Sequence, residues 1–100
     1  MDDSDGFHKA DDGKAALSII PMASLEEAAW VMEMGAQKYS RDNWRGGSPQ
    51  RYVDAALRHI FAWSDPSFED TDGESGRSHL AHALCCLLFA VHLEKFNGSD

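Results

Sequence analysis

Two histidines in the second half of the chain are the side chains best suited to hold a metal ion. His79 and His82 are spaced i, i+3, so on a helix both lie on one face. The same face continues with three apolar residues, Cys86, Phe89 and Leu93. Asp72 and Glu74 precede this helix, and inward-facing imidazoles beside carboxylates form a candidate metal or phosphate site. Carboxylate-rich surroundings favour Mg²⁺, and imidazole shifts the preference toward Mn²⁺.

A second set of polar residues lies on the helix expected over residues 24–39. Its members, spaced i, i+4, i+7 and i+11, are Glu26, Trp30, Glu33 and Gln37. They form one stripe apart from the core face, which is either a solvated surface or a carboxylate face for a divalent cation. Glu26 is the metal ligand and catalytic carboxylate expected from this stripe, because Glu27 is expected to complete a capping box with Ser24.

The helix expected over residues 48–64 carries a third group. His59 shares a half-buried face with apolar neighbours, so it is either a core histidine or a phosphate-binding group. Asp54 has Arg51 at i−3 and Arg58 at i+4. A salt bridge within the helix therefore competes with a role for Asp54 as a metal ligand.

Basic residues are few, so their placement is informative. Lys14 follows an acidic, glycine-containing turn, and Lys38 ends the first expected helix. Three arginines, Arg41, Arg45 and Arg51, flank the Asn43-Trp44 loop. Such a cluster can hold a triphosphate while an indole ring, from Trp30 or Trp44, stacks on a base. Taken singly, each of these charges is also typical of a solvated surface.

Three helices are expected to position these groups. Residues 1–13 are predicted to form a flexible acidic arm, and residues 14–22 an extended apolar segment packed onto the core. The helices are expected over residues 24–39, 48–64, and from a start within 75–78 to residue 96, joined by polar loops. The last helix is apolar nearly all round, which predicts burial on several sides. The prediction is an all-α, compact three-helix domain, with residues 14–96 as a single catalytic unit.

Composition limits the partners and the compartment. Seventeen acidic and nine basic residues among 100 give a net charge of −8, which argues against nucleic-acid binding. A chain this short buries little surface, so a homodimer or homotetramer is expected to complete the core. No segment approaches the roughly 20 apolar residues of a membrane span, and no signal peptide is expected. The adjacent Cys85 and Cys86 are expected to be buried and reduced, which favours the cytoplasm.

Several motifs follow one another in order along the chain. They are Lys9-x-Asp11-x-Gly13-Lys14, Ile20-Pro21, Gly35-Ala36-Gln37-Lys38-Tyr39, Asn43-Trp44, Asp54-Ala55-x-x-Arg58-His59 and Asp72-x-Glu74-Ser75-Gly76-x-x-His79-Leu80-x-His82. From Lys9 to about Glu94 the sequence resembles the N-terminal domain of phage and bacterial dATP/dGTP diphosphohydrolases, which is related to MazG-like all-α nucleoside-triphosphate pyrophosphatases. The Glu-x-x-Glu and Glu-x-x-Asp helices of MazG-like proteins have no clean copy here, and the nearest carboxylates are Glu26, Glu33 and Asp54.

The resemblance implies hydrolysis of dATP or dGTP to the monophosphate and pyrophosphate with Mg²⁺ or Mn²⁺, at a site built between subunits. The expected metal ligands are Glu26, Asp54, Asp72, Glu74, His79 and His82, with Glu26 or Glu74 as the general base. The expected phosphate ligands are Lys14, Lys38, Arg58 and His59, and Asn43 with Trp44 would bind the nucleoside. Two alternatives stay open: a nucleoside-monophosphate phosphohydrolase that uses a transition metal, and a non-catalytic nucleotide-binding or assembly module.

Overall fold

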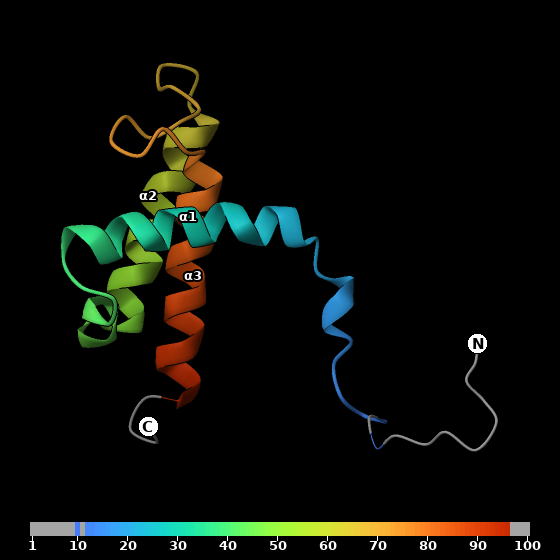
Figure 1. Cartoon of the computed structure of the whole chain (residues 1–100). Coiled ribbons are helices and arrows are strands. Elements are labelled where there is room, and N and C mark those ends of the chain that lie inside the picture. The colour runs from blue at the N-terminus through green and yellow to red at the C-terminus, as the bar shows by residue number, and fades with distance from the viewer. Residues whose placement is uncertain (1–9, 11, 97–100) are drawn as a thin grey trace.

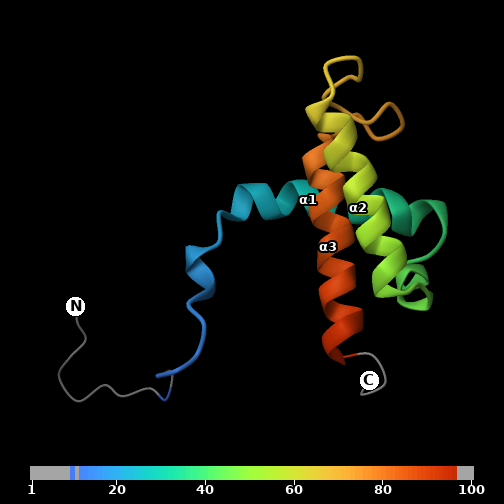
Figure 2. The same cartoon turned by 180° about the vertical axis from the view of Figure 1, so that it is seen from behind.

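The computed structural model describes residues 10 and 12–96, most of which lie in three helices. These are α1 (Met22–Lys38), α2 (Pro49–Ser64) and α3 (His79–Phe96), with short 3₁₀ helices η1 (Leu17–Ile19) before α1 and η2 (Asn43–Gly46) before α2. Figure 1 and Figure 2 show α2 and α3 side by side and antiparallel, with α1 crossing them. The predicted all-α fold is confirmed.

The start of α2 follows its sequence signals closely. The Ser48 hydroxyl caps the helix by accepting a hydrogen bond from the Arg51 N–H at 3.4 Å, and Pro49 occupies the first helical position. Proline is favoured there because that position has no helical acceptor for an N–H. The helix ends at Ser64, just before Asp65 and Pro66, as predicted.

The start of α1 differs from the prediction. The helix begins at Met22, with Pro21 as its cap and no side-chain capping bond. Ser24 already lies in the first turn, where its N–H donates to the Pro21 carbonyl at 2.9 Å, so the predicted capping box with Glu27 is wrong. Glu27 instead accepts from Arg77 at 3.2 Å. This ion pair joins α1 to the loop that precedes α3.

The core is built from small side chains where α1 crosses α3. At this crossing the buried residues are Ala28, Val31, Ala81 and Cys85, and the side chains packed around them are Met32, Leu84 and Phe89. Alanine at the crossing allows two helices to approach closely. Tyr39 is 65% exposed, because α1 ends at Lys38 and the chain turns away there.

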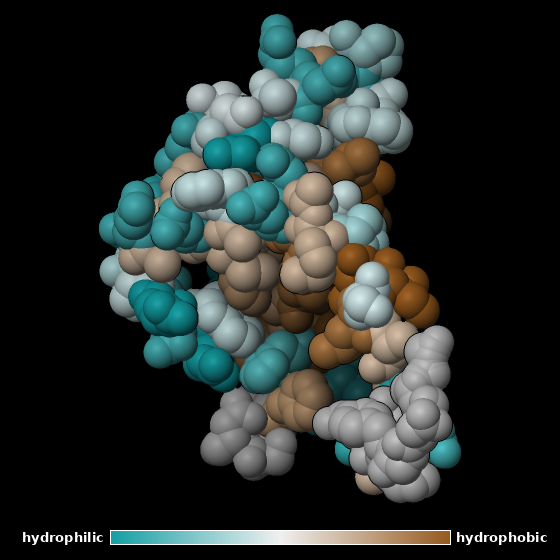
Figure 3. Space-filling view, turned by 45° about the vertical axis from the view of Figure 1, so that its right-hand side comes forward, coloured by the Kyte–Doolittle hydropathy of each residue, from teal (hydrophilic) through white to brown (hydrophobic). Residues whose placement is uncertain are grey.

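Two apolar regions predicted to be buried are exposed in the single chain. Leu17 and Ile19 are 70% and 80% exposed, and Figure 1 shows their segment extending away from the helices. The prediction that residues 14–22 pack onto the core is therefore wrong for this chain alone. Burial of α3 on several sides is also wrong in part, because one stripe of it is exposed: Leu80, Leu87, Leu88 and Val91. Figure 3 shows hydrophobic surface, coloured brown, gathered toward the right-hand part of the face that it presents.

Because α3 carries apolar side chains on its exposed stripe as well as on its buried side, its mean hydropathy is high for a helix in so small a domain. Among the described residues, α3 alone has the length and mean hydropathy, 1.2 over 18 residues, that a membrane span needs. The core helix of a soluble domain meets the same criteria, and 33% of this window is already buried inside the chain. Length and composition are thus weak evidence for a span.

Candidate metal centre and substrate pocket

The loop between α2 and α3 folds back on itself. Thr71 and Ser78 form an isolated antiparallel bridge, and the Asp72 N–H donates to the Arg77 carbonyl at 2.8 Å. Gly76 closes the turn with a φ of 72°, a conformation that glycine adopts without strain, and its N–H donates to the Asp72 carbonyl at 2.8 Å. The backbone therefore holds Asp72 beside the first turn of α3.

The Asp72 carboxylate is oriented by backbone donors within this turn. Its Oδ1 accepts from the N–H groups of Glu74 at 2.9 Å and Ser75 at 3.1 Å. Partial burial raises the pKa of Asp72, but the N–H groups of Ser75 and Glu74 outweigh burial and hold that pKa below its ordinary value. Both bonds go to Oδ1, so Oδ2 receives no hydrogen bond from the described part of the chain. Asp72 is an ionised carboxylate with one oxygen available for a ligand.

Three imidazoles meet beside this carboxylate. His59 comes from α2, and His79 and His82 come from the start of α3. The Nδ1 atoms of His59 and His79 lie 2.9 Å apart, and the rings of His59 and His82 stack with centroids 4.5 Å apart. Ligand atoms of His59, Asp72 and His79 all lie within 4.8 Å of one another. One metal ion can bridge atoms at that spacing.

His82 is buried, with 8% of its surface exposed. Its Nε2 lies 2.6 Å from the Ser75 hydroxyl and 3.9 Å from Asp72 Oδ1. Burial lowers the pKa of both His59 and His82; the neighbouring imidazoles lower that of His59 further, while Asp72 opposes the shift at His82. The neutral imidazoles that result are the form that binds metals. Burial also raises the pKa of the Cys85 thiol to about 12, so this sulfur stays protonated and is a poor ligand.

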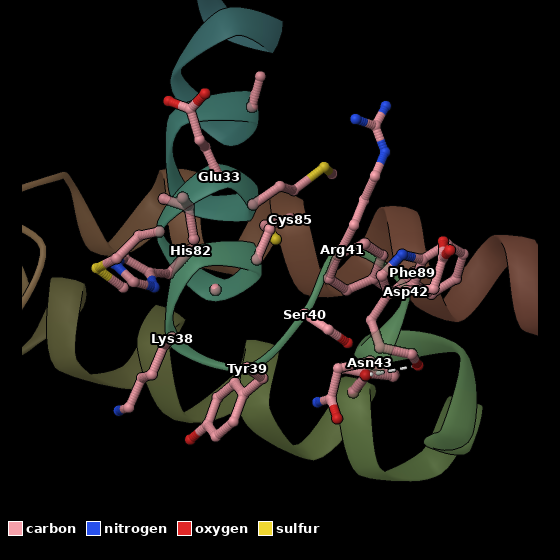
Figure 4. Close-up of a pocket in the computed structure, with 18 of the residues that line it drawn as sticks. Glu33, Lys38, Tyr39, Ser40, Arg41, Asp42, Asn43, His82, Cys85 and Phe89 are labelled. Carbon is pink, nitrogen blue, oxygen red and sulfur yellow. Dashed lines mark hydrogen bonds between the residues drawn. The ribbon is translucent and has the colours of Figure 1, made fainter.

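The cluster borders a pocket of about 730 Å³ between the second half of α1, the loop around η2, and the facing sides of α2 and α3. A volume of this size accommodates a small-molecule ligand. Figure 4 shows its labelled lining: Glu33 and Lys38 on α1, Tyr39 to Asn43 on the segment that follows α1, and His82, Cys85 and Phe89 on α3.

One ion pair crosses this pocket from α1 to the loop before α3. Lys38 Nζ donates to Glu74 Oε2 at 2.9 Å, with the two side chains 47% and 60% exposed. The hydrogen bond and charge of Glu74 raise the pKa of Lys38. An exposed pair of this kind contributes little to stability, so both groups can exchange partners for a ligand at low cost.

Aromatic rings form another wall of the pocket. Trp44 stacks on Phe89 with centroids 4.4 Å apart and planes 9° apart, and the Tyr52 hydroxyl donates to the Trp44 carbonyl at 2.8 Å. The Arg45 guanidinium lies 4.6 Å from the Trp44 ring centroid. Trp44 is thus already engaged within the chain, and stacking on a base would require Arg45 to move.

Comparison with known proteins relates the chain to one family. The family model described as dATP/dGTP diphosphohydrolase, N-terminal, matches residues 4–99. The chain belongs to this family. A dATP/dGTP diphosphohydrolase of Salmonella phage PMBT28 is 43% identical over 85 residues, which cover 85% of this chain and 29% of that protein. The chain therefore spans less than a third of that relative. No solved structure matches the chain, and the relation to MazG-like enzymes remains a prediction.

Most of the predicted site residues lie together. Those that line the pocket are Lys38, Asn43, Trp44, His59, Asp72, Glu74 and His82. His79 joins them through its contact with His59. His59, expected to bind phosphate, lies at the candidate metal centre.

Four other predicted residues do not line this pocket: Lys14, Glu26, Asp54 and Arg58. All four are exposed. Asp54 accepts a hydrogen bond from Gln50 Nε2 at 2.9 Å, and within the described residues neither Arg51 nor Arg58 forms the salt bridge with it that was one of its two interpretations. Glu26 lies in the first half of α1, away from the half that borders the pocket.

Ser75 lies at the site but was not among the site residues predicted from the sequence. Its hydroxyl accepts from the Arg77 N–H at 3.0 Å and contacts His82, so it connects the turn to α3. The signal was present, because Asp and Ser within a glycine-rich turn readily bond to nearby backbone groups. Glu33 of the polar stripe and Arg41 of the basic cluster, both candidates from the sequence, also line the pocket.

Proposed function

We propose that this domain hydrolyses dATP or dGTP to the nucleoside monophosphate and pyrophosphate with a divalent cation, Mg²⁺ or Mn²⁺. The family and the name of the phage relative support a diphosphohydrolase. The observation that carries the proposal is the meeting of His59, Asp72 and His79 at the edge of a pocket that also holds Lys38 and Glu74.

The residues present fit a metal ion. Two imidazoles and one carboxylate converge, all are partly buried, and one Asp72 oxygen receives no hydrogen bond from the residues that the structure describes. The pKa values of Asp72 and His59 are both lowered, so these two groups are in their ligand forms near neutral pH. A bound divalent cation would neutralise phosphate charge and polarise the P–O bond.

The other groups of the pocket supply binding and proton transfer. The Lys38 ammonium, whose partner is Glu74, would bind the triphosphate. Glu74 is the general base, since it lines the pocket whereas Glu26 does not. A water oxygen attacks the α-phosphorus, one proton of that water passes to Glu74, and the bond to pyrophosphate breaks. Asn43 lies beside Trp44 on the pocket loop, where both would contact the nucleoside.

A second candidate function follows from the donor set. Imidazoles with a carboxylate favour a transition metal, which suits a nucleoside-monophosphate phosphohydrolase releasing phosphate. A nucleotide-binding module without turnover is the non-enzymatic alternative. Products separate these three functions: pyrophosphate, phosphate, or none with binding retained.

We also propose that the chain works as a homodimer or homotetramer in the cytoplasm. The exposed stripe of α3 and the exposed η1 segment support this, because contiguous apolar surface on a small domain marks an interaction site. The net charge of −8 supports the prediction that nucleic acid is not a partner.

The deciding experiment is incubation with each of the four dNTPs and Mg²⁺ or Mn²⁺, with products resolved by ion-exchange chromatography. Monophosphate and pyrophosphate from a purine dNTP, abolished by EDTA and by Glu74→Gln, are the expected result. Glu94→Gln, an exposed carboxylate on α3 outside the pocket, is the matched control and should keep full activity. Binding without products would overturn the enzymatic proposal.

A further inference from the structure

The candidate metal centre draws its ligands from three separate parts of the chain. His59 lies on α2, Asp72 lies in the loop between α2 and α3, and His79 is the first residue of α3. A site of this kind forms only when the fold forms. With metal–nitrogen distances of about 2.1 Å, two ligand nitrogens at right angles lie about 3 Å apart. The observed 2.9 Å between the Nδ1 atoms of His59 and His79 matches that separation.

The donor types discriminate between cations. Mg²⁺ prefers oxygen ligands and keeps much of its hydration, whereas imidazole suits the later first-row ions. Here two of the three donors are imidazole nitrogens. The surrounding carboxylates do not change this balance, because neither Glu74 nor Glu33 belongs to the cluster of ligand atoms.

We infer that His59, Asp72 and His79 bind one first-row transition-metal ion, Mn²⁺, Fe²⁺ or Co²⁺, in preference to Mg²⁺. The inference rests on the proposed function only for the role of the cation in hydrolysis. His59 and Asp72 line the pocket, so a metal ion that these residues held would be accessible to solvent or phosphate, as in catalytic metal sites.

His82 is a positioning residue in this arrangement. Its Nε2 is engaged by the Ser75 hydroxyl at 2.6 Å, and its ring stacks on that of His59 at 4.5 Å. It therefore fixes the plane of the His59 ring and connects it to the turn that carries Asp72. Residues that contact metal-ligating side chains orient those side chains and tune the affinity for the metal.

The test is metal binding by chelator-treated protein, independent of turnover. Titration with Co²⁺, followed by its visible absorption, and competition with Mn²⁺ and Mg²⁺ measure stoichiometry and preference. One Co²⁺ per chain is expected, with Mn²⁺ binding at least about ten-fold more tightly than Mg²⁺. His59→Gln and His79→Gln should each weaken binding about 100-fold and change the spectrum. His82→Gln should weaken binding about ten-fold and keep the spectrum.

His92→Gln is the matched control, since His92 lies on α3 but outside the cluster. Binding unchanged in His59→Gln and His79→Gln, or equal affinity for Mg²⁺ and Mn²⁺, would overturn the inference. If a variant does not fold, histidine ring NMR signals of the wild-type protein provide the test: Co²⁺ must shift those of His59 and His79 before that of His92. Tight metal binding without hydrolysis would support this metal site and overturn the proposed function. Hydrolysis that persists in variants lacking these metal ligands would support the proposed function and overturn the metal site.

Discussion

The Nδ1 atoms of His59 and His79 face each other at 2.9 Å although the residues belong to different helices. At this distance one nitrogen donates and the other accepts, so one hydrogen occupies the contact. Protonation of both rings would place two N–H groups against each other. The metal-free protein therefore has a contact that tolerates acid poorly.

Metal-free protein is expected to lose stability as the pH falls from about 7 toward 5. The pKa values of His59 and His82 are lowered, chiefly by burial, whereas unfolded histidine titrates near 6.5. Between the lowered values and 6.5 the unfolded state binds more protons, so acid favours unfolding. Thermal unfolding in EDTA at several pH values measures this slope.

The double variant His59→Gln/His82→Gln is expected to flatten the slope in that pH range, and His92→Gln should leave it steep. A slope that persists in the double variant would show that other groups cause the acid sensitivity.

Gly47→Ala is expected to destabilise the fold by about 1–3 kcal/mol, the usual range for overpacking. A Cβ at Gly47 would lie 2.7 Å from the Tyr52 ring, whose hydroxyl bonds to the Trp44 carbonyl and whose ring packs on Phe89. Gly46→Ala is the control, because nothing lies within 4 Å of its Cβ. Urea denaturation compares the two, and equal stabilities would contradict the close packing of Tyr52.

Local signals in the sequence predicted the elements best. Ser48 and Pro49 marked the start of α2 because a hydroxyl cap and a proline each act within one turn. The i, i+3 spacing of His79 and His82 placed both on the inner side of α3, as the structure confirms for His82, which is buried. Such features need no information about distant parts of the chain.

Long-range partners could not be predicted in the same way. Glu27 had a plausible local role with Ser24, yet it pairs with Arg77, 50 residues away. His59 meets His79 only because α2 and α3 run antiparallel with one particular register. Neither contact can be predicted from residue spacing. His59 was therefore predicted to bind phosphate and not to lie at the metal centre.

Lys38→Met is expected to lower kcat/KM for the purine dNTP about 10- to 100-fold, the loss typical of one charged hydrogen bond. Lys38 bonds to Glu74 in the pocket, and the proposed role transfers its ammonium to the triphosphate. Lys38→Arg should keep most activity because it keeps the charge. Lys95→Met, in the last turn of α3, is the control. Steady-state kinetics measures all three, and unchanged kinetics in Lys38→Met would limit Lys38 to its ion pair.

The wild-type protein is expected to sediment as a dimer or tetramer, with α3 in the interface. Leu87, Leu88 and Val91 are 40%, 36% and 55% exposed on one stripe of that helix, and burial of apolar area stabilises association by about 25 cal/mol per Å². Val91→Glu would place a charge in this stripe and should shift the protein to monomers in analytical ultracentrifugation. Gln37→Glu adds the same charge at an exposed polar position of α1 and should leave the assembly intact. A monomeric wild-type protein, or Val91→Glu with unchanged mass, would mean that this stripe does not join copies of the chain.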